Sequence, residues 1–163
     1  MSNDLIGYRT ICITGGTGSF GNAFATHVLT TCHDVKIRIF SRDEYKQSIM
    51  RTQLGDDRMS YLLGDVRDIE RLRLAFHGAD LVIHAAALKR IDSAEYNPLE
   101  YIQTNVGGSA NVVRAAIDCG VRRSILLSTD KAVSSVTTYG STKALAERLW
   151  VQANVYAPSG PVF

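Results

Sequence analysis

The sequence has few cysteines, little net charge and no long hydrophobic run, and each scarcity excludes a class of protein. Its three cysteines, Cys12, Cys32 and Cys119, are an odd number and include no closely spaced pair. This pattern argues against a disulfide framework or a metal site and indicates a reducing cytoplasm. The formal charge of +2 is too small to indicate a nucleic-acid or membrane-surface partner. No apolar run approaches the roughly 20 residues that a membrane span needs, and residues 1–8 carry no apolar signal core.

What remains is an ordinary globular composition with a regular order of elements. Hydrophobic residues make up 45% and charged residues 21% of the 163 residues, which predicts one domain, residues 1–163, with a sizeable core. Strand patterns lie at residues 11–13, 35–40, 59–63, 81–83 and 124–127. Helical patterns lie at residues 20–29, 44–54, 68–76, within 97–118, and at 139–153. Strands that alternate with helices predict parallel βαβ units, and hence a doubly wound, mostly parallel α/β sheet of the Rossmann type.

The last residues have the pattern of a further strand. Pro161, Val162 and Phe163 follow a turn signal at residues 158–160. A domain rarely ends on the opening residues of an apolar strand. We therefore expect a chain truncated at the start of its sixth strand.

The clearest binding signal is the glycine-rich segment TGGTGSFG at residues 14–21. It falls between the first expected strand and the first expected helix, where such a loop binds the pyrophosphate of a dinucleotide. We assign Gly16 to the tight turn, Gly18 to the close approach of the pyrophosphate and Gly21 to helix–strand packing. A glycine-rich turn without a ligand is the alternative. The predicted contacts are Gly15, Thr17, Gly18, Ser19, Phe20 and Gly21.

The end of the second strand indicates which dinucleotide binds. An NAD site normally has a carboxylate here, about 20 residues after the glycines, for the ribose 2′-hydroxyl. This chain has Ser41 and Arg42 instead, and a guanidinium suits a 2′-phosphate. Lys46 would add charge or cover the adenine. The alternative is a solvated Arg42 beside Asp43 as a helix cap, but we expect NADP rather than NAD.

Two further strand ends supply candidate cofactor contacts. After the third strand, Asp65 and Val66 would lie near the adenine amino group, although Asp65 could equally be a simple turn carboxylate. After the fourth strand, Ala85, Ala86 and Ala87 are small enough to let the cofactor lie against the sheet.

Lys89 and Asn105 are the candidate substrate-binding residues. Lys89 follows the alanines and would point into the crevice, with a solvated loop lysine as the alternative. Asn105 would bond across the sheet to hold the strand of the active site, unless it is an ordinary helical asparagine. We expect His84, before the alanines, to be a packed, hydrogen-bonded residue rather than a ligand.

The candidate catalytic residues follow the fifth strand. Tyr139 and Lys143 are four residues apart and would share one face of a helix. An ammonium at that position favours the ionised form of a phenol, which can then accept a proton from a carbinol. Thr129, Asp130 and Lys131 precede this pair and combine a hydroxyl, an acid and an amine; the alternative is an exposed ion pair in a loop.

These motifs together resemble the N-terminal part of the extended short-chain dehydrogenase/reductase superfamily. Within it, the chain is most similar to the inverting UDP-N-acetylglucosamine 4,6-dehydratases (5-epimerising) of bacterial surface-sugar pathways. The segments that carry the resemblance are residues 14–21, 41–44, 84–89, 95–98, 128–132 and 139–143. Thr-Asp-Lys at residues 129–131 is the most specific of them. The family continues into a C-terminal domain that binds the nucleotide-sugar and is absent from this chain.

The resemblance implies a UDP-sugar substrate and a role for each candidate. Tyr139, supported by Lys143, would take the proton of the sugar 4-hydroxyl while hydride passes to NADP, and Thr129 would bond to the same oxygen. Lys131 would remove the proton on carbon 5 and Asp130 would protonate the departing 6-hydroxyl.

Two other functions are compatible with the sequence. A nucleotide-sugar 4-epimerase needs Tyr139 and Lys143 but not Asp130 and Lys131. A non-catalytic NADP-binding fragment needs only the cofactor loop. The superfamily also implies a homo-oligomer through the helices that begin near Asn97 and Tyr139. Leu145, Leu149 and Trp150 offer an apolar stripe for that contact, unless the stripe covers the sheet of its own subunit.

Overall fold

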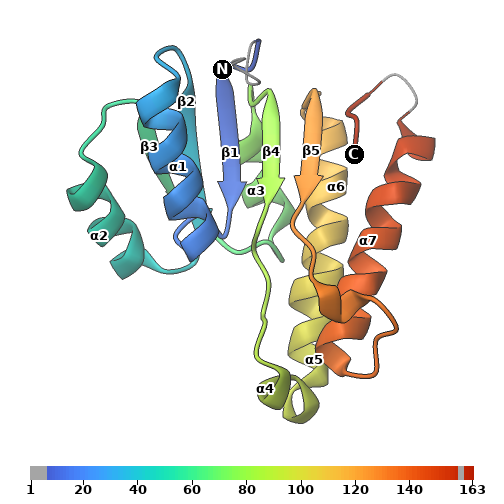
Figure 1. Cartoon of the computed structure of the whole chain (residues 1–163). Coiled ribbons are helices and arrows are strands. Elements are labelled where there is room, and N and C mark those ends of the chain that lie inside the picture. The colour runs from blue at the N-terminus through green and yellow to red at the C-terminus, as the bar shows by residue number, and fades with distance from the viewer. Residues whose placement is uncertain (1–6, 158–159) are drawn as a thin grey trace.

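The chain folds into a parallel five-stranded sheet with helices on both faces (Figure 1). The computed structural model describes residues 7–157 and 160–163. The strands are β1 (Thr10–Thr14), β2 (Lys36–Ser41), β3 (Met59–Leu63), β4 (Leu81–His84) and β5 (Arg123–Leu126). The order across the sheet is β3-β2-β1-β4-β5, and each neighbouring pair is parallel. This is the doubly wound arrangement that the sequence predicts, with the reversal of strand order between β1 and β4.

The long helices are α1 (Ser19–Thr31), α2 (Glu44–Leu54), α3 (Ile69–Phe76), α6 (Gly108–Asp118) and α7 (Thr138–Tyr156). Two separate cores show which helices cover which face. Ile11 and Ile13 of β1 pack with residues of α1 and α2. Cys12, which points to the opposite face because side chains alternate along a strand, packs with residues of α3, α6 and α7. Burial raises the pKa of the Cys12 thiol to about 12, so it is an inert core residue as expected.

Helix boundaries agree with the sequence where a cap defines them. The carboxylate of Asp43 accepts a hydrogen bond from the backbone N–H of Lys46 at the start of α2, and Asp68 does the same for Arg71 at α3. Gly55 ends α2 with a left-handed backbone. The expectation that Asp43 caps a helix is therefore confirmed.

The region between β4 and β5 differs from the single long helix expected within residues 97–118. It consists of α4 (Ile91–Tyr96), α5 (Pro98–Tyr101), a π-helix (Ile102–Gly107) and α6. Pro98 begins α5 and lacks the N–H that would continue α4 into it. Gly108 begins α6 against α3, where a Cβ would lie 2.6 Å from a methyl group of Val66. A short 3-10 helix, Asp130–Ala132, also follows β5.

The expected sixth strand begins beside β5. Val162 forms a parallel bridge with Arg123, and its carbonyl accepts the N–H of Ser124 at 2.8 Å. Residues 158 and 159 of the predicted turn lie outside the described residues. Within the described part of the chain, no helix is both long and apolar enough to cross a membrane.

Candidate active site

A cleft of about 740 Å³ opens at the carboxyl edge of the sheet, around the ends of β1, β2 and β4. This edge, at the reversal of strand order, is where ligands of such sheets bind. The predicted residues that line the cleft are Gly15, Thr17, Gly18, Ser41, Arg42, Lys46, Val66, Ala85, Ala86, Ala87 and Lys89. The predicted cofactor contacts outside its lining are Ser19, Phe20, Gly21, Asp65, Tyr139 and Lys143.

The glycine loop is fixed by close approaches of backbone. Gly15 has a left-handed φ of +66°, and a Cβ there would lie 2.7 Å from the backbone of Ala86. A Cβ at Gly21 would lie 2.1 Å from the carbonyl oxygen of Gly16, so the packing role of Gly21 is confirmed. Gly16 lies in the turn as assigned, where a Cβ would lie 2.9 Å from the carbonyl oxygen of Ile13, and Gly15 adds the left-handed backbone that only glycine adopts without strain.

The two cations predicted for the 2′-phosphate lie at the mouth of the cleft. Nη1 of Arg42 is 3.3 Å from Oδ2 of Asp65, and about half of the Arg42 side chain is exposed. Nζ of Lys46 is 3.4 Å from the carboxylate of Asp43. Both ion pairs are largely solvated, and such pairs contribute little stability. Either cation can therefore exchange its carboxylate for another anion at small cost.

Ser41 is held more firmly than the sequence indicates. Its side chain is buried, and its hydroxyl accepts a hydrogen bond from Nε2 of Gln47 at 3.0 Å. The same amide nitrogen lies 2.9 Å from the carbonyl oxygen of Leu62 on β3. Gln47, which the sequence analysis missed, thus orients the one hydroxyl predicted to face the 2′-phosphate.

The floor of the cleft is made of small residues with one unpartnered hydroxyl. Ala85, Ala86 and Ala87 line it after β4, and the exposed Lys89 lies at its margin. Thr104 of the π-helix also lines it, and its Oγ1 is buried without a hydrogen-bond partner among the described residues. A buried hydroxyl without a partner is costly, so Thr104 is a candidate ligand contact. The sequence analysis named its neighbour Asn105 instead.

His84 is a packed, hydrogen-bonded residue, as expected. Its Nδ1 lies 2.6 Å from Oγ1 of Thr14 and its Nε2 lies 3.1 Å from Oγ of Ser109. Its ring stacks on Trp150, with centroids 5.5 Å apart. Burial, and secondarily the charge of Lys143, lower the pKa of His84 to about 3. The imidazole is therefore neutral and connects β1 with α6 and α7.

Asn105 holds a loop in place. Its Oδ1 accepts the N–H of Leu88 at 2.8 Å, and its Nδ2 donates to the Leu88 carbonyl at 2.9 Å and to Oγ1 of Thr142 at 3.1 Å. Thr142 in turn donates to the carbonyl of Tyr139. Asn105 is buried and its amide is used within the protein, so the structure shows it in a holding role, and its assignment to substrate binding stays a prediction. It joins the chain after β4, rather than β5, to the first turn of α7.

The π-helix explains how Asn105 reaches that position. An extra residue per turn rotates the side chains that follow it, and such segments occur often at functional sites. Apart from the adjacent pair Gly107 and Gly108, nothing in the sequence indicates this insertion.

Tyr139 and Lys143 lie on the first turns of α7, as predicted. Nζ of Lys143 donates to the carbonyl of Leu127, just after β5, at 2.6 Å, and only 5% of the residue is exposed. Burial lowers the pKa of Lys143, while the charge of Glu147 opposes the shift. Tyr139 is partly exposed, one turn before the ammonium.

The segment with Thr129, Asp130 and Lys131 packs directly against the start of α7. A Cβ at Gly140 would lie 2.2 Å from the carbonyl oxygen of Lys131, so only glycine fits there. Ser128 donates a hydrogen bond to Glu147 of α7. These two contacts place the hydroxyl, the acid and the amine beside the helix that carries Tyr139.

Asp130 and Lys131 form an ion pair at the surface. Nζ of Lys131 is 2.5 Å from Oδ2 of Asp130. The side chain of Lys131 is 48% exposed and that of Asp130 is 78% exposed. Oγ1 of Thr129 donates to the other carboxylate oxygen at 3.0 Å. Hydrogen bonds from Lys131 and then from Thr129 lower the pKa of Asp130. The alternative of an exposed ion pair therefore describes its present geometry.

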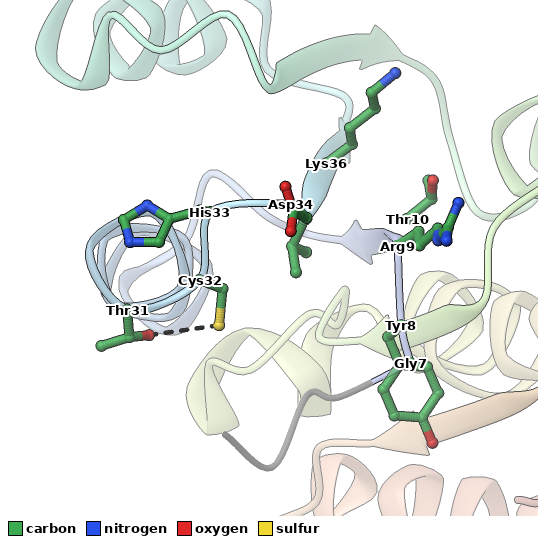
Figure 2. A pocket seen from close by; sticks show the side chains of 10 residues that line it. Gly7, Tyr8, Arg9, Thr10, Thr31, Cys32, His33, Asp34 and Lys36 are labelled. Atoms are coloured by element: carbon green, nitrogen blue, oxygen red, sulfur yellow. Dashed lines mark hydrogen bonds between the residues drawn. The ribbon is translucent and has the colours of Figure 1, made fainter. Parts of the chain in front are cut away.

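A second cavity, of about 860 Å³, lies at the opposite edge of the sheet. Figure 2 shows the side chains around it, which come from the segment before β1 and from the connection between α1 and β2. Its charged members are Arg9, Asp34 and Lys36, beside the titratable side chains of Tyr8, Cys32 and His33. None of the predicted site residues lies there, and amino ends of parallel strands are not where such sheets bind ligands.

The chain matches the polysaccharide biosynthesis protein family over residues 11–160. It is 49% identical over 146 residues to an inverting UDP-N-acetylglucosamine 4,6-dehydratase of Campylobacter jejuni, a match that covers 90% of this chain and 44% of the relative. It is also 49% identical over 146 residues to a UDP-glucose 4-epimerase of Rickettsia felis, which covers 88% of this chain and 43% of that relative.

Among solved structures, the chain is similar to Pen from Bacillus thuringiensis. The TM-score is 0.88 at 36% identity, over 93% of this chain and 47% of that one. The chain thus spans less than half the length of these two curated relatives and of this solved structure.

Proposed function

Because the chain belongs to the polysaccharide biosynthesis protein family and has the fold of the extended short-chain dehydrogenase/reductases, we propose that it is the cofactor-binding and catalytic half of an NADP-dependent enzyme. The proposed reaction is 4,6-dehydration of UDP-N-acetylglucosamine with inversion at carbon 5. It would serve the cytoplasmic synthesis of bacterial surface polysaccharide or flagellin sugars.

One observation carries the choice of reaction. Asp130 and Lys131, an acid and an amine in direct contact, are packed against the first turn of α7 beside Tyr139. Oxidation of a sugar hydroxyl needs only Tyr139 and Lys143. Loss of water also needs a base for carbon 5 and an acid for the 6-hydroxyl, and this pair supplies one of each.

The cleft fits a nicotinamide dinucleotide on two structural grounds. Gly15, Thr17 and Gly18 of the glycine loop line the cleft, so that backbone can approach a pyrophosphate, and the buried Thr104 hydroxyl lacks a partner among the described residues. Gly15, Gly18 and Arg42 would hold the phosphates, and Ala85 the ring face. When bound, the nicotinamide accepts hydride from carbon 4 and later returns it to carbon 6.

The chain's own groups would handle the protons of the first step. Tyr139 takes the proton of the sugar 4-hydroxyl, and Thr129 hydrogen-bonds to the same oxygen. The Lys143 ammonium, held against the Leu127 carbonyl, favours the ionised phenol by its charge. The ketone formed at carbon 4 then acidifies the hydrogen on carbon 5.

The second step uses the ion pair. An amine is a base only when uncharged and a carboxyl is an acid only when protonated, so transfer of one proton from Lys131 to Asp130 creates both working forms. Water opposes that transfer at the present exposure, but a sugar covering the pair would favour it because desolvation penalises charged forms. Lys131 then removes the proton on carbon 5 and Asp130 protonates the departing 6-hydroxyl as water. Reprotonation of carbon 5 by solvent, from the face opposite Lys131, inverts it, and Tyr139 releases to solvent the proton that it took from the 4-hydroxyl.

Product analysis tests this function. The chain, extended with the remaining segment of the Campylobacter relative, is incubated with NADP and UDP-N-acetylglucosamine in deuterated water. We expect a product lighter by one water molecule and carrying deuterium at carbon 5. A product of unchanged mass would overturn the dehydration.

A nucleotide-sugar 4-epimerase is the second candidate, because a UDP-glucose 4-epimerase matches the chain at the same identity as the dehydratase. The two candidates give different products in the same assay. A 4-epimer formed equally well by a variant with both Asp130→Asn and Lys131→Ala would establish the epimerase.

We also propose a homo-oligomer through α6 and α7. Leu145 on α7 is half exposed and suits such a contact. Trp150 does not belong to that surface: it is 5% exposed and packs against His84 and Phe163 of its own chain. A strictly monomeric species at high concentration in light scattering would refute the oligomer.

A further inference from the structure

Asp65, beside the mouth of the cleft, is held mainly by Arg67. Its Oδ2 lies 2.8 Å from Nη2 and 3.0 Å from Nε of Arg67, and its Oδ1 accepts the backbone N–H of the same residue at 2.9 Å. The far side of the Arg67 guanidinium is 3.1 Å from Oε2 of Glu100 on α5. One arginine therefore satisfies both oxygens of Asp65.

Arg42 makes a weaker contact with the same carboxylate. Among the described residues its side chain makes one hydrogen bond, from Nη1 to Oδ2 of Asp65 at 3.3 Å, and it is 49% exposed. Arg42 lines the cleft, whereas Asp65 and Arg67 do not. The Arg42 guanidinium can thus turn toward an anion in the cleft without leaving Asp65 unpaired.

Asp65 remains an anion in this arrangement. Burial raises its pKa, but the hydrogen bonds from Arg67, with the charge of Arg42, outweigh burial and leave the pKa below its ordinary value. Without Arg67, the carboxylate would be partly buried beside Arg42 as its nearest cation. An arginine satisfied by a carboxylate in a two-bond contact is a poorer ligand for a phosphate, because both anions use the same face of the guanidinium.

We propose that Arg67 is a specificity-determining residue for the nucleotide: by neutralising Asp65 it leaves Arg42 available to a 2′-phosphate. Arg67 is a positioning residue, since it acts through Asp65 and Arg42 and lies outside the lining of the cleft. The proposal rests on the proposed NADP function and adds to it the group that decides between NADP and NAD.

The test measures the affinities of the 163-residue chain for NADP and for NAD by calorimetry. In Arg67→Met, the ratio of the affinity for NADP to the affinity for NAD should fall on the order of three- to tenfold. The double variant Asp65→Asn, Arg67→Met should restore the ratio, because no carboxylate remains to compete for Arg42. Arg71→Met is the matched control: Nε of Arg71 bonds to the carbonyl of Leu63, and the ratio should not change.

The possible outcomes distinguish failure of the Arg67 proposal from failure of the proposed NADP function. Equal loss of affinity for both dinucleotides in Arg67→Met gives that residue a merely structural role and overturns the proposal. A lowered ratio that the double variant fails to restore also overturns it, since the effect would not pass through Asp65. An unmodified chain that binds neither dinucleotide, or prefers NAD, refutes the NADP assignment itself before any substitution is made.

Discussion

The glycine loop at residues 14–21 and the segment from Ser128 to Lys131 lie at the same edge of the sheet but are held in different ways. In the glycine loop, backbone approaches backbone so closely at Gly15 and Gly21 that no side chain fits. In the segment after β5, the working groups of Asp130 and Lys131 are exposed and bond mainly to each other.

The difference indicates that the first region is more preorganised for its ligand than the second. The glycine loop has its binding geometry already, because sterics alone define it. The segment that carries Asp130 and Lys131 is held by the close approach of Gly140 to the Lys131 carbonyl and by the bond from Ser128 to Glu147, while the charged groups themselves are exposed to solvent. We infer that the first region binds its ligand without further change and that the second needs a substrate to exclude water.

The largest expected effect divides the chemistry of the second region. In the chain extended with the remaining segment of a relative, Tyr139→Phe should abolish oxidation at carbon 4, by roughly 10²–10⁴-fold or more. Lys131→Ala should leave oxidation at carbon 4 intact but block exchange of the carbon 5 proton. Deuterium entering carbon 5 from solvent at the normal rate in Lys131→Ala would remove that residue from the role of base.

A smaller loss is expected when the sterics of the first region are broken. Gly15→Ala places a Cβ 2.7 Å from the Ala86 backbone in a left-handed conformation, and should cost at least about 3 kcal/mol of unfolding free energy together with dinucleotide binding. Gly55→Ala is the control: its φ is also positive, +51°, but nothing lies within 4 Å of the added atom. Its cost should be about 1 kcal/mol with binding unchanged. Similar urea midpoints for the two variants would contradict the steric account.

His84 bonds to Thr14 at the start of the first region and stacks on Trp150 of α7, and its burial predicts a dependence of stability on pH. Its pKa is about 3 in the folded chain and about 6.5 when unfolded, so the unfolded chain binds the extra proton between these values. Unfolding free energy should therefore fall by up to about 1.4 kcal/mol per pH unit as the pH drops from about 6.5 toward 3. His84→Gln, which keeps hydrogen-bonding groups but does not titrate, should flatten this part of the urea-denaturation profile. Identical slopes for the two proteins would show that another group controls the acid response.

The smallest effect concerns the edge of the first region, where charge and not sterics operates. Arg42→Asp should reverse or flatten the preference for NADP over NAD, because a carboxylate accepts the ribose 2′-hydroxyl and repels a 2′-phosphate. Calorimetry of both dinucleotides measures the change. Equal affinities in the unmodified chain would remove Arg42 from this role.

Features that depend on residues close together in the chain could be predicted from the sequence. The strands, the helix cap at Asp43 and the glycine loop depend on residues close together in the chain, so the sequence predicts them. Tyr139 and Lys143 are likewise one helical turn apart.

The features that the sequence did not predict depend on contacts between residues that are distant in the chain. The π-helix arises from an inserted residue that propensity does not register, and it aims Asn105 at Leu88 and Thr142. In the sequence Trp150 belongs to an apolar stripe, but in the structure its ring stacks on His84, which is far away in the chain. The unpartnered Thr104 hydroxyl is visible only once the cleft is formed.

A complete cofactor region beside an incomplete pair at residues 130 and 131 should bind NADP without turning over a sugar, and a single assay can measure both. The 163-residue chain, saturated with NADP, is incubated with UDP-N-acetylglucosamine, and water loss from the sugar is followed by mass spectrometry beside the extended chain. Holding the reactants in place can lower the activation barrier by roughly 7–11 kcal/mol. We therefore expect the 163 residues alone to bind NADP with negligible turnover. Turnover as fast as that of the extended chain would contradict it.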